Sequence, residues 1–288
     1  MPDQDAGMLP TLDVVPLLPL ERAALLEVLG TLDPEGWECP TECPAWTVKG
    51  VALHVLGDDL SLVSRQRDEA VNGIVLEALR PGAPADFRAL LDRFNERWVE
   101  TATFFGTGLV QELLELTGHL TARFYGEAEP DSIGEPVGLF GGDPAPYWQI
   151  AAREYLERWV HQSQIRRAVA APALEDPALV VPGCAVVARA LVRPLASVDV
   201  PTGATVVLAL DGGEGAWTYT REAGRWALTD AAAADPTARL SLPLPDAALV
   251  LTRGLPADEV RPRFTVTGDR AVAGPIVDRL ALIAGRPA

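Results

Sequence analysis

The stretch that decides the fold is PYWQIAAREYLERWVHQSQIRRAVA, residues 146–170, whose apolar residues recur at the spacing of one face of an α-helix. It contains His161, one of three histidines in the chain, four residues after Glu157. Side chains four residues apart on a helix share a face and can converge on one point. Glu154 is a second carboxylate on the same stripe. The pair is therefore either a buried polar contact or two arms of a metal site.

Four segments before this one also have helical periodicity. They are residues 20–32, 47–70, 86–105 and 109–126. Thr47 is predicted to cap the second of them, and Asp33-Pro34 is predicted to stop the first. Such helices predict an antiparallel bundle. The connection 126–146 is rich in Gly, Pro and acid, which predicts a loop near the mouth of the bundle.

The composition changes after residue 171, where APALEDPA predicts a linker. A short helix is expected at 185–192, and two more at 245–254 and 269–285. Alternating strand-like runs separated by Gly- and Asp-rich turns are found at 205–212, 216–222, 225–230 and 238–244. The sequence thus predicts two domains, a helical bundle at 1–172 and an α+β domain at 173–288.

The charge and composition exclude several classes of partner. A net charge of −16 argues against nucleic acid and against an anionic membrane surface, since both require clustered basic residues. With 48% hydrophobic and 22% charged residues, the chain is typical of a globular protein with an ample core. The N-terminus is acidic where a signal peptide is basic, and the apolar run 180–192 is interrupted by Pro182 and Arg189. We therefore expect a cytoplasmic protein without a membrane span.

Cys39, Cys43 and Cys184 are too few, and odd in number, for a disulfide framework. Cys39 and Cys43 have a spacing that could ligate metal, but each precedes a proline in WECPTECPAW, a pattern that favours a turn. The simpler interpretation is that of buried, apolar thiols.

His54, in the second predicted helix, offers a partner for the pair on the last one. It shares a helical side with Thr47, Val51, Asp58 and Ser61. If that side faces the inside of the bundle, His54 could join a carboxylate and His161 in a two-histidine, one-carboxylate site. Zinc accepts this ligand set, and three protein ligands leave one position open for water or substrate. Asp58 could then orient a ligand from outside the set.

The spacing by itself does not establish this site. Glu154 competes with Glu157 as the carboxylate, and a hydrogen-bonded but inert polar pair inside a bundle has the same pattern. His119 also has a glutamate four residues earlier, Glu115. The cationic Arg123 follows His119 at the next turn and would repel a metal, so we interpret His119 as a surface or structural residue.

Two segments resemble one known family. WECPTECPAWTVKGVALHVLGD (37–58) resembles the "PT.CPGWTV.D...HL.G" segment of the mycothiol-dependent maleylpyruvate isomerase family, whose N-terminal domains are DinB-like four-helix bundles. ERWVHQSQIRRAVA (157–170) resembles that family's "E.WVH..DIRRAL" segment. The C-terminal part, ending FTVTGDRAVAGPIVDRLALIAGRPA, is similar to the sterol-carrier-like domain that often follows.

This resemblance implies a divalent metal, typically zinc, held by His54, Glu157 and His161. It favours Glu157 over Glu154 and leaves His119 outside the site. It also implies a thiol cosubstrate such as mycothiol, whose thiolate adds to a small electrophile in an isomerase or S-transferase reaction.

Three positions depart from the family pattern. Ala45 stands where glycine is common, and Gly50 stands where an acid is common. Gln164 replaces an aspartate, so a neutral amide takes the place of a charge that could orient the ligand shell or accept a proton.

The C-terminal domain could supply a cation for a substrate carboxylate. Arg221, Arg225 and Arg253 are the candidates, although a surface role is the simpler interpretation for each. Two other functions fit the sequence: a non-catalytic protein that binds a small molecule or lipid, and a hydrolase that uses zinc-bound water. The substrate, the thiol, the metal and the oligomeric state do not follow from the sequence.

Overall fold

The computed structural model describes residues 9–213 and 215–284. Residues 1–8, including most of the acidic N-terminus, and residue 285 of the last predicted helix lie outside this part. The chain forms two compact units. One comprises residues 15–129 and 164–172, and the other comprises the described residues within 9–14, 130–163 and 173–284. The domain boundary at residue 172 stays a prediction.

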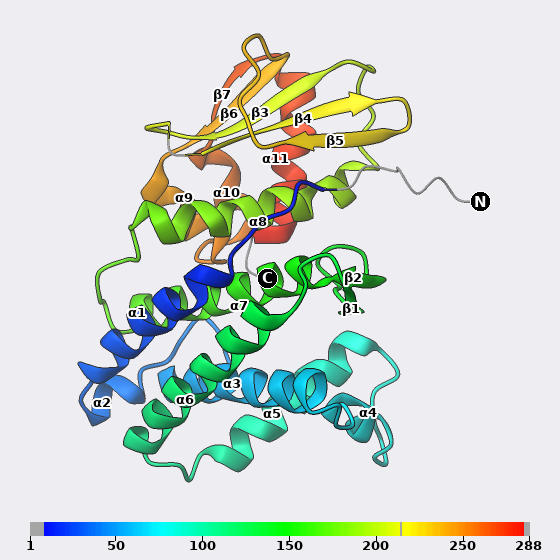
Figure 1. Cartoon of the computed structure of the whole chain (residues 1–288). Helices are drawn as coiled ribbons and strands as arrows, with labels where there is room; N and C mark the ends of the chain where they lie inside the picture. The colour runs from blue at the N-terminus through cyan, green and yellow to red at the C-terminus, as the bar shows by residue number, and fades with distance from the viewer. Residues whose placement is uncertain (1–8, 214, 285–288) are drawn as a thin grey trace. The chain divides into compact units, whose positions relative to one another are not determined.

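The first unit is helical. Its elements are the 3₁₀ turn Val15–Leu17, α1 (Leu18–Gly30), α2 (Pro34–Trp37), α3 (Val48–Leu62) with a π-helical continuation Val63–Arg67, α4 (Gly73–Ala78), α5 (Phe87–Ala102) and α6 (Thr107–Glu127). α3 packs against both α5 and α6, and α6 also contacts α1 (Figure 1). The helical region predicted from periodicity is confirmed.

Side chains mark where these helices begin. Thr47 caps α3 as predicted, because its hydroxyl accepts a hydrogen bond from the Gly50 amide. Asp33 accepts from the Gly36 amide and so caps α2. Asp33-Pro34 therefore ends one helix and starts the next. The short helix α4, capped by Asn72, was not predicted.

The core of this unit is built around α3. It includes Val51 and Leu53 from α3, Val99 from α5 and Ile165 from the end of a later helix. Trp98 of α5 reaches this helix through a notch at Gly57, and its indole N–H donates to the Leu53 carbonyl at 2.6 Å. A Cβ at residue 57 would lie 2.3 Å from the indole nitrogen, so only glycine permits this contact.

A buried ion pair ties α1, α3 and α6 together. Arg22 donates to the Asp59 carboxylate at 2.7 Å, and both side chains are at most 5% exposed. The Thr117 hydroxyl donates to the same carboxylate oxygen. Gly118 leaves room for Arg22, since a Cβ there would lie 2.8 Å from the arginine Cγ. Glycine in α6 therefore has a packing reason, despite its poor helix propensity.

The second unit begins with a small hairpin of β1 (Ile133–Pro136) and β2 (Pro144–Pro146), followed by α7 (Tyr147–Ala168), whose last turn belongs to the helical unit. The loop predicted at 126–146 therefore contains two short strands, which pair antiparallel. Three prolines and a glycine in these strands hid their pattern.

A five-stranded sheet, in the order β5-β4-β3-β6-β7, forms the rest. The strands are β3 (Thr205–Leu210), β4 (Ala216–Glu222), β5 (Arg225–Thr229), β6 (Ala238–Leu242) and β7 (Thr265–Gly268). β3 and β6 are parallel, and the other neighbours are antiparallel. Four of the strands match predicted ones, whereas β7 was missed.

Four further helices belong to the described part of this unit. They are α8 (Pro177–Leu195), α9 (Leu244–Leu251), α10 (Ala257–Val260) and α11 (Arg270–Ala284). α8 contacts β4 and β5, and α11 contacts β6 and β7 (Figure 1). The predicted α+β class is confirmed. Residues 171–176 of the expected linker carry no helix or strand, and the expected short helix at 185–192 is part of a longer one. α8 begins at Pro177, because Asp176 caps it and proline is favourable in the first turn.

α8 is also long and apolar enough to cross a bilayer, judged by length and composition alone. Its apolar window is 67% buried inside the structure. A core helix of a globular unit has this pattern, because it is apolar on all sides.

Candidate metal centre

The helix α7, which contains the stretch 146–170 apart from its ends, brings Glu157 and His161 together. The His161 Nε2–H donates to Glu157 Oε1 at 3.1 Å. The His161 side chain is 9% exposed, whereas that of Glu157 is one third exposed. An imidazole nitrogen and a carboxylate oxygen thus point at the same place one turn apart on α7.

Glu154, the competing carboxylate, is engaged elsewhere. Arg153 donates to one of its oxygens at 2.6 Å, and Arg158 donates to the other at 2.8 Å. Glu154 and Arg158 are nearly completely buried. A carboxylate held by two guanidinium groups cannot turn to a metal without leaving a buried cation unpaired. Of the two carboxylates, Glu157 is therefore the one that faces His161.

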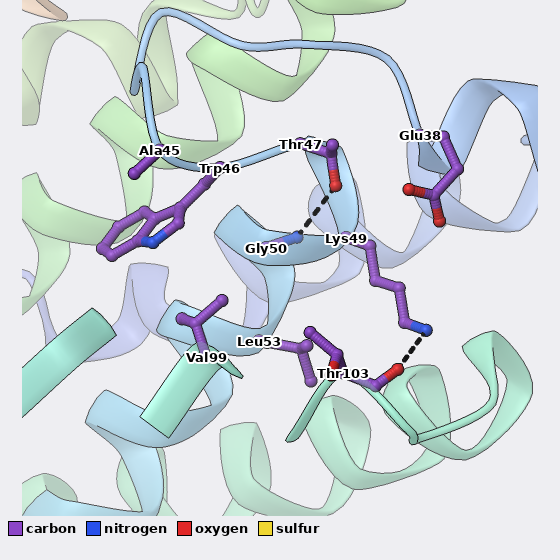
Figure 2. Close-up of a pocket in the computed structure, with 9 residues that line it drawn as sticks. All are labelled: Glu38, Ala45, Trp46, Thr47, Lys49, Gly50, Leu53, Val99 and Thr103. Carbon is purple, nitrogen blue, oxygen red and sulfur yellow. Dashed lines mark hydrogen bonds between the residues drawn. The ribbon is translucent and has the colours of Figure 1, made fainter. Parts of the chain in front are cut away.

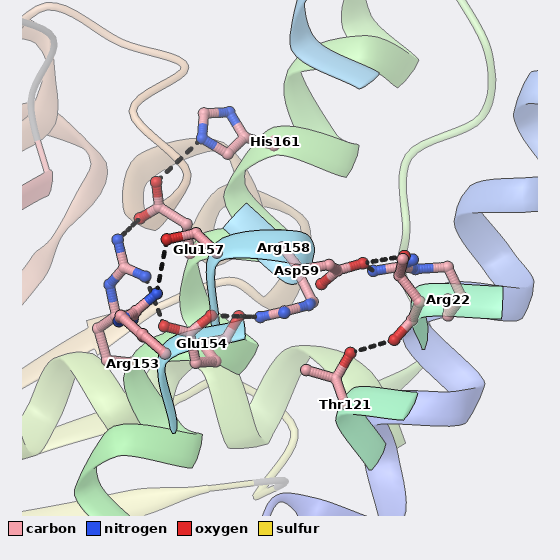
Figure 3. Close-up of polar contacts among 11 residues, drawn as sticks. Arg22, Asp59, Thr121, Arg153, Glu154, Glu157, Arg158 and His161 are labelled. Carbon is pink, nitrogen blue, oxygen red and sulfur yellow. Dashed lines mark hydrogen bonds and ion pairs between the residues drawn. The ribbon is translucent and has the colours of Figure 1, made fainter. Parts of the chain in front are cut away.

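Arg153 also approaches Glu157. Its second terminal nitrogen lies 3.6 Å from Glu157 Oε2, the oxygen that does not accept from His161 (Figure 3). One oxygen of Glu157 therefore faces the histidine while the other faces the guanidinium. Sequence reasoning missed Arg153, although its spacing of four residues from Glu157 is the pattern of a helical ion pair.

His54 is held by an aromatic neighbour. It is 6% exposed on α3, and the Trp46 indole stacks on its imidazole with ring centroids 4.7 Å apart and planes 28° from parallel. Stacking covers a face of the imidazole and leaves its nitrogen-bearing edge to point elsewhere. Trp46 was not predicted to have a role, although it lies within the motif that carries the family resemblance.

The loop carrying Trp46 is fixed to the end of α7. Arg167 forms a bidentate pair with Glu42, with N···O distances of 2.8 and 2.6 Å. The Cys43 thiol donates to the Gln164 side-chain oxygen at 3.3 Å. Gln164, which replaces the family's usual aspartate, therefore serves as an acceptor for this loop. Since Ile165 also lies in the core with Leu53, the C-terminal turn of α7 is fixed beside α3.

His54, Glu157 and His161 have ligand atoms that all lie within 4.8 Å of one another. They form the one cluster of three or more His, Cys, Asp or Glu side chains suited to a metal in the described part of the chain. Ligands about 2.1 Å from a tetrahedral zinc lie about 3.4 Å apart. A bound ion of this kind would hold the three ligand atoms closer together than the 4.8 Å within which they all lie here. His161 must then give up its Nε2 proton.

The other residues predicted from the sequence do not belong to this cluster. Asp58 is half-buried one turn after His54, and its orienting role stays a prediction. His119 is exposed on α6, which agrees with its interpretation as a surface residue, and Arg123 pairs with Glu127. Cys39 and Cys43 lie in the hydrogen-bonded turn that the prolines predicted, with no third ligand beside them among the described residues.

Two of the three arginines proposed for substrate binding have local contacts. Arg225 pairs with Glu222 at the surface, and the Arg221 guanidinium lies 6.0 Å from the centre of the Trp226 ring. Arg253 is exposed after α9, with a positive φ of 59°. Their roles toward a substrate stay predictions.

Comparisons with known proteins identify a family for the helical part of the chain. Residues 18–166 match the family model described as the mycothiol maleylpyruvate isomerase N-terminal domain. A crystal structure of a histidine-to-alanine mutant of mycothiol-dependent maleylpyruvate isomerase superposes with a TM-score of 0.51 at 13% identity, covering 88% of this chain and 91% of that one. A second structure of a mycothiol-dependent maleylpyruvate isomerase gives 0.49 at 14% identity, covering 83% and 87%. No curated protein matches the sequence.

Proposed function

Because the chain belongs to the mycothiol maleylpyruvate isomerase family through its N-terminal domain, we propose that it is a metal- and thiol-dependent isomerase or S-transferase. Its substrate would be a small electrophile, and its cosubstrate a low-molecular-weight thiol such as mycothiol. The observation that carries this proposal is the cluster of His54, Glu157 and His161.

The donor set suits a divalent metal, most simply zinc, because two imidazoles and a carboxylate are ligands that zinc prefers. Three protein ligands leave a coordination position for an exogenous group. A metal bound there would lower the pKa of the thiol cosubstrate, so that its nucleophilic thiolate forms near neutral pH.

The residues around the cluster hold the ligands in place. Trp46 stacks on His54 and restricts rotation of the imidazole. Arg153 lies beside the Glu157 oxygen that faces away from His161. Gln164 accepts from Cys43, so it holds the loop but cannot take a proton as an aspartate could. We expect another group, or solvent, to receive the thiol proton.

The catalysed step would follow from the thiolate. Its sulfur adds to an electrophilic carbon and forms a C–S bond. In an isomerase, rotation about the former double bond and elimination of the thiolate regenerate the cosubstrate. In a transferase, the adduct takes up a proton and leaves.

The test separates this proposal from its alternatives. Protein made without a histidine tag is analysed for metal, alongside a His54→Ala variant and a His119→Ala control. We expect one metal per chain in the wild type and the control, and loss in His54→Ala. Substoichiometric metal that is unaffected by His54→Ala would favour a metal-independent binding protein.

Consumption of a panel of electrophiles is then measured with and without mycothiol. Turnover only with the thiol supports the proposal. Turnover that ignores the thiol but requires the metal would instead indicate a hydrolase that uses metal-bound water.

A further inference from the structure

A small pocket opens in the helical unit beside the N-terminus of α3. Its volume is about 290 Å³, which is at the lower end for small-molecule sites. Figure 2 shows its wall, formed by the Trp46 indole, the apolar Leu53 and Val99, and polar residues at the ends of α2, α3 and α5. Gly50 contributes to this wall by its small size, since a Cβ there would lie 2.8 Å from Trp46 Cβ.

The pocket contains the single lysine of the chain, whose other 23 basic residues are arginines. Lys49 Nζ donates to the Thr103 carbonyl at 2.7 Å. An ammonium has three donors, so this bond uses one of them. Lys49 therefore brings a compact positive donor to a site that a guanidinium would fill more fully.

Glu38 supplies the opposite charge to the same pocket. Its carboxylate makes no hydrogen bond or ion pair with the residues that the structure describes. A ligand that carries only negative charge would be repelled by Glu38, and one that carries only positive charge would be repelled by Lys49. A neutral polyol has both donors and acceptors and satisfies both groups.

The aromatic wall fits the same class of ligand. A six-membered polyhydroxylated ring presents an apolar C–H face, which can stack on an indole while its hydroxyl groups reach polar neighbours at the rim. Trp46 offers this surface, and the same indole stacks on His54. The pocket therefore adjoins the histidine of α3 through one shared side chain.

We propose that this pocket binds the sugar–cyclitol part of the thiol cosubstrate, with Trp46 as the stacking surface and Lys49 and Glu38 as the hydrogen-bonding groups. This inference rests on the proposed function for the identity of the ligand. Mycothiol is a cysteine joined through an amide to a glucosamine–inositol unit, so its thiol and its ring system are separate parts that can occupy neighbouring sites.

Direct binding tests the pocket without any reaction. The probe is N-acetylglucosaminyl-inositol, a neutral, thiol-free analogue, added to the metal-stripped full-length protein and followed by saturation-transfer NMR. The variants are Lys49→Met and Glu38→Gln. Arg88→Met, which removes an exposed charge on α5 outside the pocket, is the control. Far-UV circular dichroism checks the fold of each.

We expect millimolar or tighter binding to the wild type and the control, and at least about tenfold weaker binding to each pocket variant, because each loses a hydrogen bond to a charged group. Glu38→Gln disturbs no contact of the described chain, so its loss of binding cannot come from misfolding. Equal binding by all four proteins, or no binding by the wild type, would overturn the pocket assignment even if thiol-dependent turnover is found. Selective loss in the variants, together with turnover that ignores thiol, would retain a polyol site and overturn the proposed function.

Discussion

Replacing each of two glutamates three residues apart on α7 by glutamine should give opposite results. Glu157→Gln removes the charge of the proposed metal-binding carboxylate. Glu154→Gln leaves that carboxylate intact but removes a charged partner of Arg158, which is 3% exposed. The two variants change the same chemical group by the same amount, so each is the matched control of the other.

The expected loss of metal follows from the ligand count. Zinc sites bind with roughly 10–16 kcal/mol shared among their ligands, so one charged ligand contributes about 3 kcal/mol. At 1.4 kcal/mol per factor of ten, Glu157→Gln weakens metal binding about a hundredfold or more. Its metal-free stability falls by less than about 1 kcal/mol, because Glu157 is one third exposed and its arginine contact is long.

Glu154→Gln should instead lower the stability and leave the metal affinity nearly unchanged. Breaking a buried ion pair typically costs about 3–5 kcal/mol, and the remaining amide oxygen can still accept one hydrogen bond, so we expect about 3 kcal/mol. Metal affinity should change by less than about tenfold.

The assay combines competition with a chromophoric chelator for metal affinity and urea unfolding in excess chelator for metal-free stability. The chelator removes the stabilisation that a bound metal gives to the folded state. Metal loss in Glu154→Gln with retention in Glu157→Gln, or equal loss in both, would refute the assignment of Glu157 and the reasoning from the arginine contacts.

Three further predictions concern the scaffold. Asp59→Ala strands its buried arginine partner and should lower the free energy of unfolding by about 3–5 kcal/mol, whereas Asp92→Ala, from an exposed pair, should cost less than about 1 kcal/mol in the same urea titration. Gly57→Ala places a Cβ on the Trp98 indole and should cost about 1–3 kcal/mol, with a shifted tryptophan emission as an independent readout. An unchanged stability for either core variant would contradict the packing described. Burial raises the pKa of the Cys184 thiol, so at pH 8 a thiol reagent should modify the two half-buried cysteines of the native protein and the third only in denaturant. The same shift means that the unfolded chain loses this proton first. Stability from this group is therefore complete below about pH 8.5 and falls as the pH rises further. Rapid reaction of all three thiols in the folded protein would contradict this.

Periodicity found the long helices because their apolar stripes repeat over many turns. It placed α1, α3, α5, α6 and α7 close to their observed bounds. The prediction failed where an element is short, or where one sequence pattern is compatible with both the end and the start of a helix. Asp33-Pro34 ends one helix and begins another, and Pro177 starts α8 where a linker was expected. β7 has four residues, too few for an alternating pattern to stand out.

For the candidate site, the sequence determined the residue types and their order. It offered His54, Glu157 and His161 as ligands, and the resemblance to a family chose among the alternatives. Only the tertiary structure could show that Glu154 is held by Arg153 and Arg158, that Trp46 covers His54, and that Gln164 holds Cys43.

The physical reason lies in the range of each interaction. A helix repeats every 3.6 residues, so the one-dimensional pattern reveals which side chains share its face. It does not reveal how charged side chains on one helix choose among neighbours, since Arg153 approaches both Glu154 and Glu157, or whether Trp46 folds back over His54. It also does not reveal contacts between distant segments, such as that of Cys43 with Gln164. These contacts decide which polar groups remain available for chemistry.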